Sequence, residues 1–157
     1  MQRGRLDDVD RRILGCLQRN ARRKATEIAE EVPVSANTVR NRIEALEEAG
    51  IIRGYRIAVD YSLTGFPLYY LFVCTTSIAD REALAGRALE VPGVVGIDEL
   101  MTGQRNLGIK VVGRDQDAIT DIARALDGLG IEVVDETLIK RDYDRSLSWF
   151  ETANGTA

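Results

Sequence analysis

The sequence contains no histidine, and this absence excludes several kinds of site at once. Serine–histidine–aspartate and cysteine–histidine nucleophiles need an imidazole, and the common zinc sites use histidine ligands. The only cysteines, Cys16 and Cys74, are isolated among apolar residues, so we expect buried free thiols and neither a disulfide framework nor a metal site. The acidic residues are scattered and form no pair typical of carboxylate catalysis. We therefore expect no enzyme, no metal and no cofactor.

Long apolar runs are missing as well. No stretch approaches the ~18 consecutive apolar residues of a membrane span, and no signal-peptide pattern opens the chain. These two features predict a cytoplasmic protein without a membrane partner. The 157 residues are 45% apolar, which suffices for one domain or two small ones with packed cores.

Lysine is scarce, and the charge is unevenly distributed. The chain has 18 arginines against 3 lysines, and arginine is the better bidentate partner of phosphate and guanine. The net charge is −4, but residues 1–60 carry 12 basic and 10 acidic side chains, whereas residues 61–157 carry 9 and 15. A mildly basic N-terminal half before an acidic C-terminal half is typical of a DNA-binding domain joined to a separate module.

The segment 32–50 predicts a turn followed by one helix. Pro33 cannot continue an incoming helix, Ser35 is a good N-cap, and Gly50 suits the left-handed residue after a helix end. One side of this helix carries an apolar stripe at Val39, Ile43 and Leu46.

The polar side of the same helix holds the candidate DNA contacts. They are hydrogen-bonding side chains at the start of the helix, namely Ser35, Asn37, Thr38, Arg40, Asn41 and Arg42. Asparagine can pair bidentately with adenine, and arginine can reach guanine or phosphate. An ordinary amphipathic surface helix with a solvated side explains the same pattern and stays open as the alternative.

Two helices are expected before this one. Asp7 is a plausible N-cap for the first, which the apolar spacing of Val9, Ile13 and Leu17 predicts, and a short second helix should cover residues 25–32. Between them lie Arg22, Arg23 and Lys24, which complement the helix dipole, contact the DNA backbone, or do both. Three such helices predict a helix-turn-helix DNA-binding domain of the winged type over residues 1–53.

The rest of the chain predicts an α+β fold with a ferredoxin-like second domain. Residues 54–67, with alternating apolar side chains and a final Gly-Phe-Pro, read as a strand-like connector. Residues 68–142 follow the βαββαβ order, with strands over 68–75, 94–101, 107–112 and 131–139 and helices over 80–90 and 115–127. Residues 143–157 form a C-terminal tail.

The first strand of this domain also predicts an assembly. Residues 68–73 are all apolar, so both faces of the strand need cover. Two helices can cover one face of the sheet, and we expect a second subunit of a twofold dimer on the other. Cover by the chain's own segment 141–157 is the alternative.

With these elements in place, the chain resembles the leucine-responsive regulator (Lrp/AsnC) family of bacterial and archaeal transcription factors. The resemblance runs from Leu6 to about Ile139 and rests on an ordered series of motifs. These are Leu6-Asp-Asp-Val-Asp-Arg-Arg-Ile-Leu14, Asn20-Ala-Arg22, Glu27-Ile-Ala29, Val34-Ser35, Thr38-Val-Arg-Asn-Arg-Ile43, Leu46-Glu-Glu-Ala-Gly-Ile-Ile52, Gly54-Tyr55 and Thr102-Gly103.

The resemblance implies a homodimer that binds palindromic operators in double-stranded DNA and often assembles into octamers or larger rings. It also implies that the C-terminal half senses a small effector, usually an amino acid, at a turn formed by Met101, Thr102, Gly103, Gln104, Arg105 and Asn106. Gly103 would allow close approach of a ligand or a positive φ. Asn106 stands where the family usually has aspartate, which removes a carboxylate partner for an ammonium group. Lys24 and Pro33 replace the family's usual capping Ser or Thr and its turn Gly.

Two other functions share parts of this pattern. Siroheme decarboxylases resemble the same two-domain arrangement, but they rely on histidine, which this chain lacks. An oligomerising ligand-binding module without DNA binding is the other alternative, because fold alone does not decide function.

Overall fold

The computed structural model describes residues 6–143, which form two compact units. One unit contains the described residues up to Ala58, and the other is Val59–Asp142. Of the expected tail over 143–157 and the suggested sheet cover by 141–157, residues 144–157 lie outside the described residues. Within them, no helix has the length and apolar character that crossing a membrane requires.

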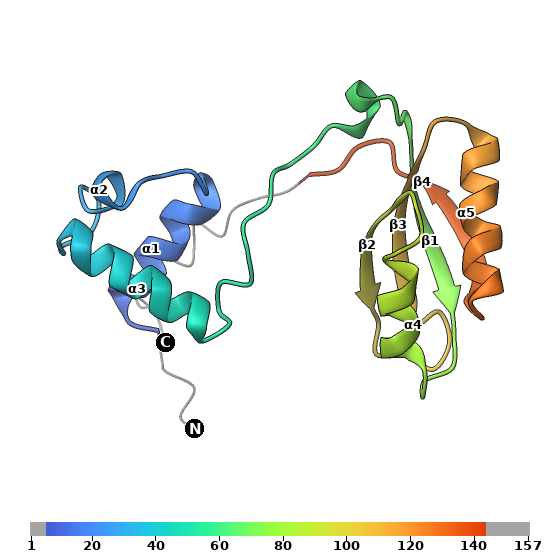
Figure 1. The fold of residues 1–157 in the computed structure, drawn as a ribbon, viewed down its shortest axis with the longest axis horizontal. Coiled ribbons are helices and arrows are strands. Elements are labelled where there is room, and N and C mark those ends of the chain that lie inside the picture. Colours follow the sequence, from blue (N-terminus) through green and yellow to red (C-terminus); the bar gives the residue numbers. More distant parts are fainter. Residues whose placement is uncertain (1–5, 144–157) are drawn as a thin grey trace. The chain divides into compact units, whose positions relative to one another are not determined.

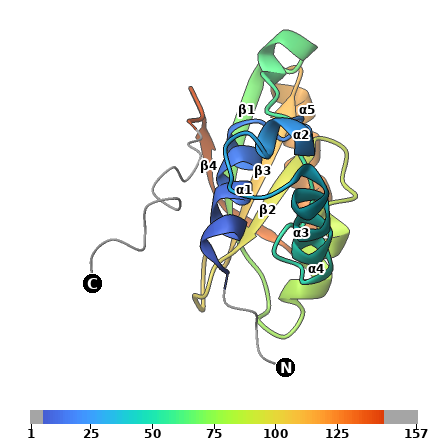
Figure 2. The same ribbon diagram turned by 90° about the vertical axis from the view of Figure 1, so that its left-hand side faces the viewer.

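The first unit is a bundle of three helices, α1 (Asp8–Arg19), α2 (Ala25–Ile28) and α3 (Ala36–Glu48). Asp7 begins α1 as predicted, because its carboxylate accepts the Asp10 backbone N–H at 2.8 Å while the Asp10 carboxylate accepts the Asp7 N–H at 3.1 Å. α1 and α2 both pack against α3 (Figures 1 and 2). Their shared core consists of Ile13, Cys16, Leu17, Ile28, Val32 and Val39.

Helix α2 is shorter than the sequence pattern predicts. It ends at Ile28, and the expected continuation to Val32 is a turn and a bend. The Glu31 backbone N–H bonds to the Ile28 carbonyl at 2.9 Å, which closes a tight turn instead of extending the α-helix. Val32 is still buried, so the apolar pattern marked a core contact correctly but not its secondary structure.

The predicted strand-like connector is also absent. Residues 53–60 have no strand, and Ile57 in this segment is 83% exposed. A strand needs a hydrogen-bonded neighbour, and this segment finds none among the described residues, so no wing strand follows α3. A short 3₁₀ helix, η1 (Tyr61–Thr64), leads into the second unit.

The second unit is an antiparallel sheet with two helices, in the predicted βαββαβ order. Its elements are β1 (Leu68–Thr75), α4 (Arg81–Ala88), β2 (Val94–Glu99), β3 (Leu107–Gly113), α5 (Gln116–Gly128) and β4 (Glu132–Leu138). The strand order is β2-β3-β1-β4, with every neighbouring pair antiparallel. This topology confirms the α+β, ferredoxin-like prediction.

The two faces of the sheet have different surroundings. α4 and α5 pack on one face (Figure 1), where Phe72 and Ile109 join Ile119 and Leu126 in the core. Strand neighbours alternate faces, so Leu71 and Val73 lie on the opposite face. Both remain partly exposed, as the predicted second apolar face of β1 requires.

Candidate nucleic-acid interface

The start of α3 is held by two hydroxyl groups. Ser35 is the predicted N-cap, and its Oγ accepts the Thr38 backbone N–H at 3.2 Å. The hydroxyls of Ser35 and Thr38 also bond to each other at 2.9 Å. Both predicted DNA contacts therefore already stabilise the first turn of the helix.

Three of the predicted polar residues share the outer surface of α3. Asn37, Arg40 and Asn41 are exposed and follow i, i+3, i+4 spacing, whereas Val39 and Leu46 are buried on the other side. These three side chains make no hydrogen bond or ion pair with any described residue. The first turn of α3 contains no acidic residue, so its positive dipole end is not neutralised locally. The arrangement offers free hydrogen-bonding groups on a helix start that favours an anionic partner.

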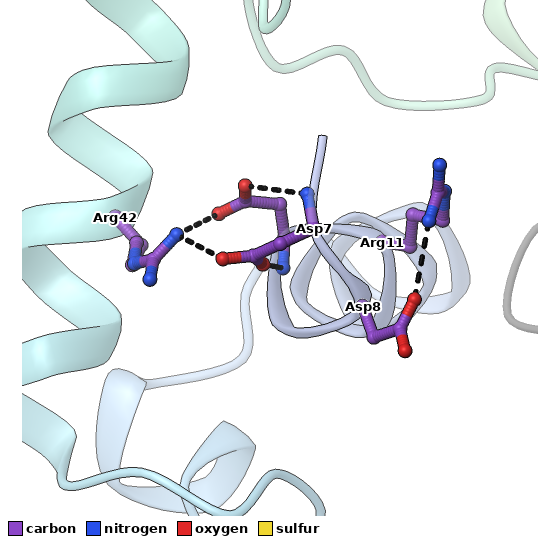
Figure 3. Close-up of polar contacts among 5 residues, drawn as sticks. Asp7, Asp8, Arg11 and Arg42 are labelled. Carbon is purple, nitrogen blue, oxygen red and sulfur yellow. Dashed lines mark hydrogen bonds and ion pairs between the residues drawn. The ribbon is translucent and has the colours of Figure 1, made fainter. Parts of the chain in front are cut away.

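Arg42 lies elsewhere. Its Nη1 donates to Asp7 Oδ2 at 2.6 Å and to Asp10 Oδ1 at 3.1 Å (Figure 3). The Asp7 hydrogen bond, chiefly, raises the pKa of Arg42, while the Asp10 backbone N–H and then Arg42 hold the pKa of Asp7 below its ordinary value. Arg42 thus joins α3 to the capping box of α1, and its contact with DNA stays a prediction.

The basic segment before α2 also divides into two groups. Arg22 and Lys24 are exposed, and their side chains have no partner among the described residues. Arg23 instead pairs with Glu31 at 2.6 Å and donates to the Glu27 carbonyl at 3.2 Å. The Glu27 carboxylate accepts the Lys24 backbone N–H at 3.0 Å, which stabilises the start of α2 without a capping Ser or Thr.

The predicted effector turn is anchored to β1. The Arg105 backbone N–H donates to the Thr75 hydroxyl at 2.8 Å, and the Thr102 hydroxyl donates to the Arg105 carbonyl at 3.2 Å. Arg105, not Gly103, adopts the positive φ of this turn, at 52°. Gly103 does not have a positive φ, and a Cβ there would meet nothing within 4 Å. Of the two expected roles of Gly103, only close approach of a ligand stays a prediction. Met101 is 98% exposed, and Gln104 is exposed as well.

Asn106 has a different position from the one expected. It is fully buried, its Oδ1 accepts the Thr76 N–H at 3.0 Å, and its Nδ2 donates to the Thr76 carbonyl at 2.8 Å. The amide therefore satisfies the backbone of the β1–α4 loop, and the predicted contact between its side chain and an effector is corrected to a structural role.

Neither cysteine is placed for reactive chemistry. Cys16 and Cys74 are buried free thiols, as predicted, and burial raises the pKa of Cys74 to about 12. Across residues 6–143, no group of three or more metal-ligating side chains gathers at one place.

Known proteins with similar sequences are transcriptional regulators with a helix-turn-helix domain. A model of the AsnC-type helix-turn-helix domain matches residues 6–47. The HTH-type transcriptional regulator LysM of Saccharolobus solfataricus is 31% identical over 147 residues, covering 91% of this chain and 99% of LysM. The chain belongs to the Lrp/AsnC family of transcriptional regulators. An uncharacterized regulator of Pyrococcus abyssi is 32% identical over 94 residues, a match that spans 59% of that relative.

Solved structures of the Lrp/AsnC fold extend the likeness to both units. LrpC of B. subtilis superposes with a TM-score of 0.75 at 22% identity, over 90% of this chain and 99% of LrpC. LrpA of Mycobacterium tuberculosis has the same TM-score at 20% identity, over 90% of this chain and 97% of that protein. At these identities the likeness establishes the shared fold.

Proposed function

We propose that this Lrp/AsnC protein binds palindromic operators in double-stranded DNA as a homodimer, with the first half of α3 in the major groove. The free, exposed group Asn37, Arg40 and Asn41 carries the proposal. Asparagine pairs bidentately with adenine, and arginine pairs with guanine or phosphate. The acidic residues of the same face begin only at Glu44, beyond the part of the helix that would enter the groove.

Contacts to the DNA backbone would fix the position of α3 in the groove. Arg22 and Lys24 are the free cations of the preceding segment and suit phosphates on one side of the groove. The proposal locates the protein in the cytoplasm with its DNA, and it needs no catalytic step. The relatives compared above are named as transcriptional regulators.

The test begins with an operator selected from genomic fragments and measured by fluorescence anisotropy. Asn41→Ala should cost ~1–3 kcal/mol and relax base preference at one position of each half-site. Arg40→Ala should weaken binding to all sequences alike and flatten the salt dependence by about one unit. Glu48→Gln, in the last turn of α3, is the control. If Asn41→Ala and Arg40→Ala both bind like the control, α3 is not the recognition helix.

We further propose that the second unit binds a small effector at the turn formed by residues 101–105. Arg105 is exposed there and can give a charge-assisted hydrogen bond to a carboxylate. Two structures with this fold support an amino acid as the ligand class. They are a transcriptional regulator of Neisseria meningitidis and the feast or famine regulatory protein of M. tuberculosis, each solved with L-methionine. Because Asn106 is occupied by Thr76, its missing charge no longer argues against an amino acid.

Calorimetry against the amino acids, beginning with methionine, tests this site. Arg105→Gln should weaken binding, whereas Arg114→Gln, which removes another exposed arginine of the same unit, should not. Equal affinities of both variants and the wild type would remove Arg105 from the site.

The assembly is proposed as a dimer through the open sheet face that carries Leu71 and Val73, with octamers formed from such dimers. Two partly exposed apolar side chains in the middle of a sheet support a partner on that face.

A further inference from the structure

One carboxylate joins the end of α1 to the turn after α2. Glu31 Oε1 lies 2.6 Å from Arg23 Nη1, and Glu31 Oε2 lies 2.9 Å from Arg19 Nη2. The thiol of Cys16 also donates to Oε2 at 3.4 Å. No local pattern predicts this cluster, because Glu31 lies 12 residues from Arg19 along the chain.

The cluster has the chemistry of a guanidinium pair bound to a phosphate. Two anionic oxygens each accept hydrogen bonds from a different arginine, which is how arginines bind phosphate groups. The hydrogen bond from Arg23, chiefly, lowers the pKa of Glu31, and the same contact raises the pKa of Arg23. Glu31 and Arg23 therefore stay charged at neutral pH.

The contact lies at the surface, where it contributes little to the stability of the fold. The Glu31 side chain is 45% exposed, and that of Arg19 is 38% exposed. Ion pairs with this much solvent add little to the stability of a fold. Removing the charge of Glu31 would therefore release Arg19 and Arg23 from this carboxylate, so that another anion such as a DNA phosphate could bind them, without loss of the core.

The position of the cluster connects it with DNA binding. Arg22 and Lys24 flank Arg23 in the chain, and they are the free cations assigned above to phosphates. In a helix-turn-helix domain the segment before the recognition helix lies across the backbone of the duplex. Arg19 and Arg23 belong to the same basic segment but are occupied by Glu31.

We propose that Glu31 is an internal mimic of a DNA phosphate, which withholds Arg19 and Arg23 from the backbone and so lowers sequence-independent affinity. The inference rests on the proposed DNA binding. Phosphate contacts supply nearly all non-specific affinity, whereas base contacts from α3 discriminate sequence. Occupying two arginines therefore favours the operator over other DNA, and Glu31 becomes a specificity-determining residue that touches no base.

Glu31→Gln is the direct test, with Glu30→Gln as its matched control. Both variants remove one negative charge from adjacent exposed positions, but Glu30 has no partner among the described residues. Affinity for operator and for random-sequence duplexes is measured over a range of salt concentrations. We expect Glu31→Gln to bind random DNA several-fold more tightly than Glu30→Gln and to steepen the salt dependence by about one to two units. The operator-to-random affinity ratio should fall.

A second pair of variants does not depend on how well Glu31→Gln folds. Arg22→Gln and Arg23→Gln remove the same charge from neighbouring positions. Arg22→Gln should flatten the salt dependence by about one unit, whereas Arg23→Gln should leave it unchanged because Arg23 is already neutralised. In a Glu31→Gln background, Arg23→Gln should regain an effect.

The outcomes separate the inference from the proposed function. Wild-type binding that depends on Asn41, together with equal behaviour of Glu31→Gln and Glu30→Gln, would overturn only the role of Glu31. So would an Arg23→Gln variant that matches Arg22→Gln, or a Glu31→Gln variant that loses affinity for all DNA. Absence of any operator binding by the wild type would instead remove the proposed function itself.

Discussion

At the N-terminus of α1, two aspartates each have two roles. Asp7 and Asp10 cap the helix by accepting each other's backbone N–H, and they also receive Arg42 from α3. Arg42 thus joins α3 to α1, and this explains why an arginine of the predicted DNA-binding group is not free. Its side chain is 39% exposed, so screening by water keeps its contribution small.

We expect Arg42→Ala to lower the free energy of unfolding by about 1 kcal/mol at pH 7, the upper end for a half-exposed pair. The pKa of Asp7 is lowered in the folded protein, so its stabilising effect is present above the unfolded pKa of about 3.9 and is lost as the pH falls through the folded value. The difference between wild type and variant should therefore shrink below about pH 4. Urea unfolding of both proteins at pH 7 and below about pH 4 measures this difference. Arg40→Ala, which removes a free arginine of α3, should match the wild type.

Asn106 is a buried polar anchor of the second unit. Asn106→Ala would leave the buried Thr76 N–H and carbonyl without partners. Each unsatisfied group costs ~1–3 kcal/mol, so we expect the two together to lower the free energy of unfolding by about 2–6 kcal/mol. Gln104→Ala, two residues away and exposed, should change stability little. Equal urea midpoints for the two variants would contradict the structural role of Asn106.

The residues predicted correctly from sequence are those with local signals. The caps Asp7 and Ser35 and the left-handed Gly50 are defined by neighbours within a few positions. Arg42 finds its aspartates 35 and 32 residues away, and Asn106 finds Thr76 30 residues away. No spacing rule connects such positions, so the sequence does not predict these tertiary contacts.

Among the helices and strands, those with a long periodic pattern in the sequence are predicted most accurately. The strand over 68–75 is reproduced without change, and helices α4 and α5 begin within one residue of their predicted starts. The prediction of a strand in the connector is wrong, because alternating apolar and polar residues form a strand only where a neighbouring strand supplies hydrogen bonds. The predicted continuation of α2 to residue 32 is wrong, because the contacts of Glu31 in the turn after α2 are tertiary and have no sequence period.

Strand β1 carries the prediction on assembly. Leu71 lies between Lys110 and Thr137 on the face opposite α4 and α5, whereas Tyr70 packs toward the helices. Leu71→Asp would place an unpaired carboxylate in the proposed dimer interface, which is costly. We expect light scattering to give a dimer or larger assembly for the wild type and a monomer for Leu71→Asp at micromolar concentration.

The control for this prediction is Thr120→Asp, which adds the same charge on the exposed side of α5. It should leave the assembly unchanged. A monomeric wild type, or identical masses for both aspartate variants, would rule out the open face as the dimer interface.

The two parts of the chain differ in net charge. Residues 1–60 have a small excess of basic side chains, while residues 61–157 have six more acidic than basic ones. The acidic portion repels the phosphate backbone, so attraction is confined to the N-terminal unit. Within that unit, only part of the arginine charge is free, because Glu31 and the capping aspartates occupy Arg19, Arg23 and Arg42. The result favours binding that depends on base contacts over binding that depends on charge alone.

The absence of histidine leads to the last prediction, which concerns the whole chain. Histidine is the side chain whose ordinary pKa lies between pH 5 and 8, and this chain has none. The pKa values of Asp7 and Glu31 are lowered from already acidic values, whereas burial and then Glu47 raise the pKa of Tyr55 to about 12. Stability from the carboxylates is therefore fully present above about pH 5. Stability linked to Tyr55 is lost only as the pH rises above about 10.

We therefore expect melting temperature and operator affinity to stay constant between about pH 5.5 and 7. A positive control is Asn37→His, which places a titrating group on the proposed DNA surface. With an ordinary pKa of about 6.5, this side chain should gain charge as the pH falls and strengthen DNA binding over the same range. Anisotropy titrations at fixed ionic strength compare the two proteins. A pH-dependent affinity in the wild type would show that a carboxylate or thiol with a strongly shifted pKa takes part in binding. A flat profile for Asn37→His would show that position 37 does not face the DNA.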